Sequence, residues 1–79
     1  MSNEEKYVEA FVNAFGVEED AVPTLEFKGI EEWDSVGHMS LISELEDAFD
    51  IMMETEDIIE LSSYEKGKEI LSSKYDVAF

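Results

Sequence analysis

The sequence predicts an all-α fold: a small four-helix bundle with three longer helices, one short third helix and a long loop between helices 1 and 2. The length of 79 residues is that of one domain, which we place over residues 1–79. Hydrophobic residues make up 44% of the chain, which is more than an acidic disordered tail carries. Apolar residues recur at helical spacing in several segments, whereas no segment alternates strictly enough to indicate a strand.

The first helix is expected over residues 3–15. One apolar stripe along it repeats every four positions, at Tyr7, Phe11 and Phe15. Ser2 and Glu5 have the spacing of a capping box, and Gly16 follows as a helix-ending residue. Both ends of this helix are therefore marked in the sequence.

The next segment, residues 16–33, lacks periodicity and holds scattered apolar side chains, at Val22, Leu25, Phe27 and Ile30. We therefore expect a long loop that is pinned to the core, and not a domain boundary. Trp33 is expected to anchor this loop by packing, because its ring can bury a large area while its N–H finds a hydrogen-bond partner.

The second helix is expected over residues 35–49 and at the centre of the fold, because it is the most apolar. Its apolar side carries Met39, Ile42, Leu45 and Phe49, with Leu41 and Ala48 beside them. Its other side carries Ser40, Ser43, Glu44 and Asp47. Gly37 in the first turn has two interpretations, close approach of a ligand or partner to the backbone or simple tolerance of glycine there. Met52 and Met53, which follow, are expected to line the core.

Two more helices complete the prediction. The third is short, over residues 56–61, with Thr55 as N-cap and contacts through Ile58, Ile59 and Leu61. The fourth covers residues 63–75, where Ser62 and Glu65 have capping-box spacing. Its expected apolar contacts are Tyr64, Ile70, Leu71 and Tyr75.

The charge balance narrows the possible partners. Lys and Arg number 5 against 21 Asp and Glu, so the formal net charge is −16. Nucleic acids and anionic lipids are bound by basic surfaces, so we expect neither as a partner. The chain has no Cys, which excludes disulfides and thiolate metal sites, and no EF-hand loop pattern, so no metal site is predicted. Without a signal-peptide pattern or a long apolar run, we expect a cytoplasmic monomer that does not insert into membranes.

The informative position is the joint between the long loop and the second helix, at Asp34 and Ser35. Helix N-termini carry unsatisfied N–H groups and partial positive charge, so a phosphate attached to a side chain there is electrostatically favoured. A simpler interpretation is that Asp34 or Ser35 only caps the helix.

The stretch Asp34-Ser35-Val36 resembles the Asp-Ser-Leu attachment motif of acyl carrier proteins. The likeness continues through Leu41, Leu45-Glu46-Asp47 and Phe49-Asp50, which are similar to the Leu…Leu-Glu-Glu…Phe-Asp pattern of the family's second helix, and through Ser62-Ser63 before the last helix. Members of the family are short, acidic, cysteine-free four-helix bundles with a long first loop. The resemblance therefore covers nearly the whole chain.

The resemblance implies a carrier and not an enzyme. In the family, a phosphopantetheinyl transferase moves 4′-phosphopantetheine from coenzyme A to the motif serine, here Ser35, and the thiol of the arm holds acyl groups as thioesters. Asp34 would assist recognition during this loading. Acyl-loading and acyl-transfer enzymes of the family grip the second helix with basic patches, and the matching positions, expected to be exposed, are Val36, Met39, Ser40, Ser43, Glu44, Glu46 and Asp47.

Some positions depart from the commonest form of the family. Val36 replaces Leu, and Gly37 and Ser40 stand where carriers of fatty-acid synthesis are often acidic. The string from Trp33 to His38 looks more like stand-alone carriers of specialised pathways. The implied function is transport of acyl intermediates in fatty-acid biosynthesis, polyketide-like or other acyl or aminoacyl transfer pathways, with the cargo left open.

Two alternatives to the carrier remain open. Ser35 and His38 lie three residues apart on a helix, and a Ser–His pair can form an activated nucleophile. The chain lacks the Gly-x-Ser-x-Gly elbow, so we expect no catalytic residues, and we expect His38 to be exposed near the arm or a partner. Met39 suits a partner contact and the core equally. The second alternative is an acidic helical interaction module that is never modified.

Overall fold

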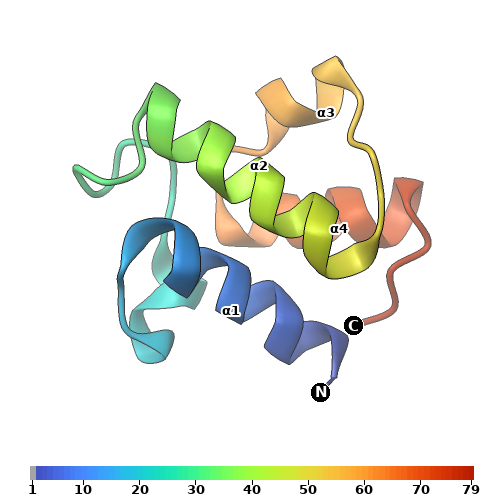
Figure 1. Cartoon of the computed structure of the whole chain (residues 1–79), viewed down its shortest axis with the longest axis horizontal. Coiled ribbons are helices and arrows are strands. Elements are labelled where there is room, and N and C mark those ends of the chain that lie inside the picture. The colour runs from blue at the N-terminus through green and yellow to red at the C-terminus, as the bar shows by residue number, and fades with distance from the viewer. Residues whose placement is uncertain (1) are drawn as a thin grey trace.

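The computed structural model describes residues 2–79 and is all-helical, as the sequence predicts. Its elements in chain order are α1 (Asn3–Phe15), the 3-10 helix η1 (Glu19–Thr24), α2 (Ser35–Phe49), α3 (Thr55–Glu60) and α4 (Tyr64–Lys74) (Figure 1). Helices α1 and α2 pack along one another, and the short α3 lies on the side of α2 away from α1 (Figure 1). Within the described residues, no helix has the length and apolar character needed to cross a bilayer.

Both ends of α1 form as expected. The Ser2 hydroxyl accepts the N–H of Glu5 and the Glu5 carboxylate accepts the N–H of Ser2, which completes the capping box. Gly16 ends the helix in the left-handed conformation at φ 69°, which glycine adopts without a steric penalty. The predicted bounds of α1 and of α2 are both confirmed.

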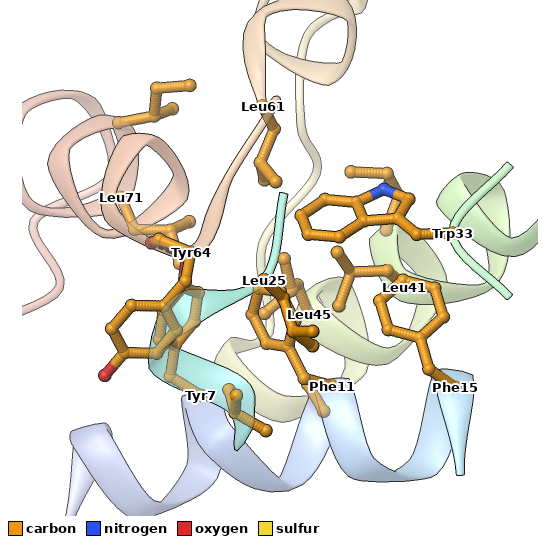
Figure 2. Close-up of a cluster of buried hydrophobic side chains, with 14 of the residues drawn as sticks. Tyr7, Phe11, Phe15, Leu25, Trp33, Leu41, Leu45, Leu61, Tyr64 and Leu71 are labelled. Carbon is orange, nitrogen blue, oxygen red and sulfur yellow. Dashed lines mark hydrogen bonds between the residues drawn. The ribbon is translucent and has the colours of Figure 1, made fainter. Parts of the chain in front are cut away.

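One aromatic-rich core joins all the elements (Figure 2). Phe11 lies edge-on to Trp33 with ring centroids 5.6 Å apart, and Phe15 stacks on Trp33 at 5.2 Å. Trp33 is fully buried, so its predicted role as a packed anchor of the loop is confirmed. The central position of α2 is also confirmed by Leu41 and Leu45, which are both fully buried.

The segment between α1 and α2 is not the continuous loop that the sequence predicts, because it contains η1. It is attached to the core as expected, through buried Val22 and Leu25. It also pairs with the chain just before α4, because the N–H of Phe27 donates to the Ser62 carbonyl and the N–H of Tyr64 donates to the Leu25 carbonyl. These bonds fix one side of the site described below.

The starts of α3 and α4 differ from the predictions. Glu54, and not Thr55, is the N-cap residue of α3, and it makes no side-chain capping bond. The Ser63 hydroxyl, and not that of Ser62, caps α4 by accepting the N–H of Lys66. The predicted Ser62–Glu65 capping box is wrong because the Ser62 carbonyl is engaged by the Phe27 N–H, which keeps this part of the chain extended and starts the helix later.

Two apolar side chains that were expected to contact the core are exposed instead. Ile59 is 74% exposed and Met52 is 87% exposed, whereas Met53 lines the core as expected. A helix of only six residues can turn one narrow face inward, and α3 uses that face for other side chains. Phe49 is only partly buried at the edge of the core, and Met39 is half-exposed.

Candidate functional site

Ser35 is the first residue of α2, where its side chain is exposed. None of the side-chain hydrogen bonds found among residues 2–79 involves its hydroxyl, and the residue is exposed to solvent. Asp34 takes the role of N-cap, since its Oδ1 accepts the N–H of Gly37 over 2.8 Å. The simple capping interpretation therefore applies to Asp34 and leaves Ser35 unexplained by local structure.

Gly37 has a different explanation from the two that the sequence suggested. A Cβ atom at this position would collide with the backbone carbonyl oxygen of Glu32 and would press on the Phe15 ring at 3.2 Å. The close approach is made by the chain's own loop, neither by a ligand nor through mere tolerance of glycine. Gly37 thus lets the loop pass close to the first turn of α2.

A groove opens beside Ser35, between α2 and α3, with a volume of about 440 Å³. Its lining is mainly apolar and includes Phe27, Ser35, His38, Met39, Ile58 and Ile59. The exposed hydroxyl of Ser35 thus lies beside a mainly apolar surface. Ile59, which the sequence places in the core, is exposed and lines this groove.

His38 is the residue whose environment differs most from expectation. It is partly buried, and it makes two hydrogen bonds through its ring. The indole N–H of Trp33 donates to Nδ1 over 2.9 Å, and Nε2 lies 2.6 Å from the carbonyl oxygen of Ile58. The prediction of an exposed His38 is wrong, and the expected partner for the Trp33 N–H is found.

The geometry of His38 also bears on the Ser–His nucleophile. A general base needs a ring nitrogen within hydrogen-bond reach of the hydroxyl proton. Both nitrogens of His38 are engaged elsewhere, so this imidazole is not placed to activate Ser35. Within residues 2–79, no three acidic or histidine side chains converge in a way that could hold a metal ion.

The predicted partner-contact residues of α2 do not share one face. Val36, Ser40, Ser43 and Asp47 follow one another at spacings of three and four residues and are exposed, so they form one outer stripe. Half-exposed Met39 turns from this stripe toward the groove.

The two glutamates of the predicted set were expected to be exposed and are partly buried instead. Glu44 lies toward α1, where its carboxylate accepts a 3.4 Å bond from the Asn13 amide. Glu46 lies on the opposite side and accepts the N–H of Met53 over 2.9 Å. Glu46 therefore stabilises the chain that leaves α2, and its carboxylate is engaged within the fold and not fully available to a partner.

Helix α3, the outer wall of the groove, is fixed to α4 by a buried carboxylate. The Asp57 side chain is fully buried and accepts 2.8 Å and 2.6 Å bonds from Lys74 Nζ and the Tyr75 hydroxyl. The Tyr75 hydroxyl in turn accepts the N–H of Glu54. Hydrogen bonding from Lys74, reinforced by Tyr75, holds the pKa of Asp57 below its usual range despite the cost of burial.

The site could be found only partly from the sequence. Ser35 and Asp34 stand out because the motif lies at a predicted helix start. The link from Trp33 through His38 to Ile58 was missed, since Ile58 is 20 residues from His38 and no periodicity connects them. The five-residue separation of Trp33 and His38 across the loop–helix joint was the one available signal.

Comparison with known proteins neither supports nor opposes the family resemblance. No family model matches the chain, and no match was found among the curated proteins or the solved structures. The likeness to acyl carrier proteins accordingly stays a prediction that rests on the residues quoted above.

Proposed function

We propose that the chain is an acyl carrier protein in which Ser35 is the attachment point of a 4′-phosphopantetheine arm. The observation that carries the proposal is the placement of Ser35: its hydroxyl is exposed and unbonded at the first residue of a 15-residue helix and lies at the rim of an apolar groove. The arrangement of helices as a carrier-type four-helix bundle with a long first loop is part of this proposal.

The residues around Ser35 suit a phosphodiester. The positive end of the α2 dipole lies at this hydroxyl, and the N–H groups of Ser35 and Val36 belong to the first turn, where anions are stabilised. One carboxylate oxygen of Asp34 caps α2 by accepting the N–H of Gly37, and this bond fixes the carboxylate of the residue that precedes Ser35. Ser35 is exposed, so its hydroxyl is accessible from solvent.

Loading would form one bond and break one bond. The Ser35 oxygen would bond to the phosphorus next to the pantetheine of coenzyme A, the pyrophosphate linkage would break with release of adenosine 3′,5′-bisphosphate, and the hydroxyl proton would pass to the transferase. The arm supplies a terminal thiol, which can hold an acyl group as a thioester. This chain has no Cys, so the arm would bring the only thiol.

The groove supports a role in sheltering cargo. Its apolar side chains can cover the apolar part of a group attached through Ser35, which removes that surface from water. The exposed stripe of Val36, Ser40, Ser43 and Asp47 offers partner enzymes an apolar contact near the arm, two hydroxyls and an acidic end.

The proposal is tested by incubating the chain with coenzyme A and a broad-range phosphopantetheinyl transferase and measuring the intact mass. The wild type is expected to gain one phosphopantetheine, and Ser35→Ala none. Ser40→Ala and Ser43→Ala are matched controls, because they remove exposed hydroxyls from the same helix, and both are expected to be loaded. A wild type that gains no mass with several transferases would favour the interaction module that is never modified.

A further inference from the structure

His38 connects the two sides of the groove beside Ser35. Its ring is nearly parallel to that of Trp33, with 15° between the planes. It packs in a T-shaped arrangement with Phe27, with the ring centroids 5.6 Å apart. Through Trp33 it is bonded to the loop before α2, and through Ile58 it is bonded to the last turn of α3. A single side chain therefore spans from the core to the outer wall of the groove.

The chemistry of the partners fixes the protons on His38. An indole N–H can only donate and a carbonyl oxygen can only accept, so Nδ1 must be unprotonated and Nε2 must carry the proton. The link thus requires the neutral imidazole. A second proton on Nδ1 would oppose the N–H of Trp33 with another N–H, and the ring could not keep both contacts.

Trp33 and Ile58 both depend on their hydrogen bonds to His38. Trp33 is fully buried, so loss of the acceptor leaves a buried N–H without a partner. The carbonyl of Ile58 belongs to the last turn of the six-residue α3, where carbonyls have no partner within the helix. Figure 2 shows the indole nitrogen of Trp33 on the side of the ring away from Phe15, directed out of the aromatic core.

We propose that the Trp33–His38–Ile58 link holds the α3 wall of the groove in place beside Ser35, and that protonation of His38 breaks the link and loosens that wall. His38 is then a positioning residue, because it acts on the space offered to a cargo without touching the attachment point. The consequence for a cargo rests on the proposed function, whereas the link itself belongs to the unmodified chain.

His38 has no charged neighbour in the lining of the groove. It is the one histidine of the chain, and the other side chains that line the groove are uncharged. The carboxylates of the neighbouring helices have partners of their own, Asp34 with the Gly37 N–H and Asp57 with Lys74. The charged side chains of the flanking loop and of α3 are exposed, at Glu26, Lys28, Glu31, Glu32, Glu54, Glu56 and Glu60. Imidazole is the side chain that ordinarily changes charge between pH 5 and 8, so pH 7.5 and pH 5.5 are the two conditions to compare.

The test follows amide exchange of α3 and exchange of the Trp33 indole N–H by NMR, on the unmodified chain at pH 7.5 and 5.5, corrected for intrinsic rates. Protection of both is expected to fall about two- to tenfold at the lower pH, which is the equilibrium factor of one hydrogen bond. Protection along α1 is expected to stay constant. The nitrogen shifts of His38 at pH 7.5 should be those of the Nε2–H tautomer.

Two variants separate the link from simple packing. His38→Gln keeps a donor and an acceptor but does not titrate, so its α3 protection should be the same at both pH values. His38→Phe fills similar space without either bond and should show the weaker protection at both. If His38→Phe does not fold, the comparison of wild type with His38→Gln decides alone.

Equal protection at both pH values in the wild type, or the same loss in His38→Gln, would overturn the proposal. Because the experiment uses no arm, a failure of Ser35 loading and a failure of the link are seen independently. If Ser35 is loaded but the protection of α3 does not respond to pH, only the proposed link is contradicted. If the protection of α3 responds to pH but Ser35 is not loaded, only the proposed carrier function is contradicted.

Discussion

Asp57 is buried without contact with solvent, yet it stays charged because Lys74 lies 2.8 Å from it. Lys74 itself is half-exposed, so the pair places its negative end inside the protein and its positive end at the surface. The contact joins α3 to the last turn of α4 and holds the groove wall from the side opposite His38. Helix α3 is therefore fixed to its neighbours by polar contacts as well as by the packing of Ile58 against the core.

Acid should weaken this attachment. Hydrogen bonding from Lys74 lowers the pKa of Asp57 from its ordinary value of 3.8, so the folded state binds this proton less readily than the unfolded chain does. The stabilisation is complete above that ordinary value and is lost as the pH falls through the lower value of the folded state. In urea unfolding, the difference between wild type and Asp57→Asn should be large at pH 7 and should shrink below pH 3.8.

Glu60→Gln is the matched control for Asp57→Asn, because Glu60 is exposed on the same helix. It should change the unfolding free energy little at either pH. A difference between wild type and Asp57→Asn that stays constant with pH would show that the pair does not control the acid response.

Glycine is required at position 67 because a side chain would not fit there, and not because of its backbone conformation. A Cβ atom there would collide with the Tyr7 hydroxyl and would lie 3.1 Å from Leu61. The Tyr7 hydroxyl cannot easily withdraw, because it donates to the Tyr64 carbonyl inside the core. We expect Gly67→Ala to lower the free energy of unfolding by about 1–3 kcal/mol. Alanine is intrinsically about 1 kcal/mol better than glycine in a helix, so a stabilised variant in chemical denaturation would show that the contact relaxes without cost.

The partial burial of Phe49 changes the expectation for core mutations on α2. Removing a fully buried phenylalanine ring costs about 3–5 kcal/mol, and Phe49→Ala should cost less because part of its ring already faces water. Fully buried Leu45 is the matched position one turn earlier, and Leu45→Ala should cost about 2–5 kcal/mol. We expect Phe49→Ala to lose less stability than Leu45→Ala, and chemical denaturation of both variants checks this order. A greater loss for Phe49→Ala would show that the face of α2 that carries Phe49 is the more buried one.

The acidic end of α2 should guide partner enzymes through Asp47. This side chain is exposed, whereas Glu46 is committed to the Met53 N–H. Asp47→Lys should raise the KM of a phosphopantetheinyl transferase about two- to fivefold at low salt, as expected when one exposed attraction becomes a repulsion, with kcat nearly unchanged. The difference should vanish as salt rises, because exposed charges are screened.

Glu46→Gln provides the contrast for Asp47→Lys. It should lower stability more than it changes KM, since it weakens the bond to the Met53 backbone. Equal effects of the two substitutions on KM at every salt concentration would argue against docking through the exposed stripe.

The sequence predicted α1 and the start of α2 correctly, because both depend on near neighbours. The stripe of α1, its capping box and the loop–helix joint at Ser35 follow from residues a few positions apart. The start of α4 was misjudged because a distant residue, Phe27, binds the Ser62 carbonyl. Local capping rules carry no information on such a contact.

The same limit applies to the site. Val36 and Asp47 are exposed as the helical period indicates, but Glu46 turned out to support the fold. The role of His38 depends on Trp33 and on α3 together, and only the folded chain brings these groups within hydrogen-bond distance.

The central claim is that Ser35 carries the arm, and locating the modification tests it most directly. After loading, the tryptic peptide that follows Lys28 and ends at Lys66 should be fragmented by mass spectrometry, because it contains Ser35 together with Ser40, Ser43, Ser62 and Ser63. We predict that every modified molecule carries a single phosphopantetheine on Ser35. An unmodified peptide after exposure to several transferases, or an arm located on one of the other serines, would contradict the account.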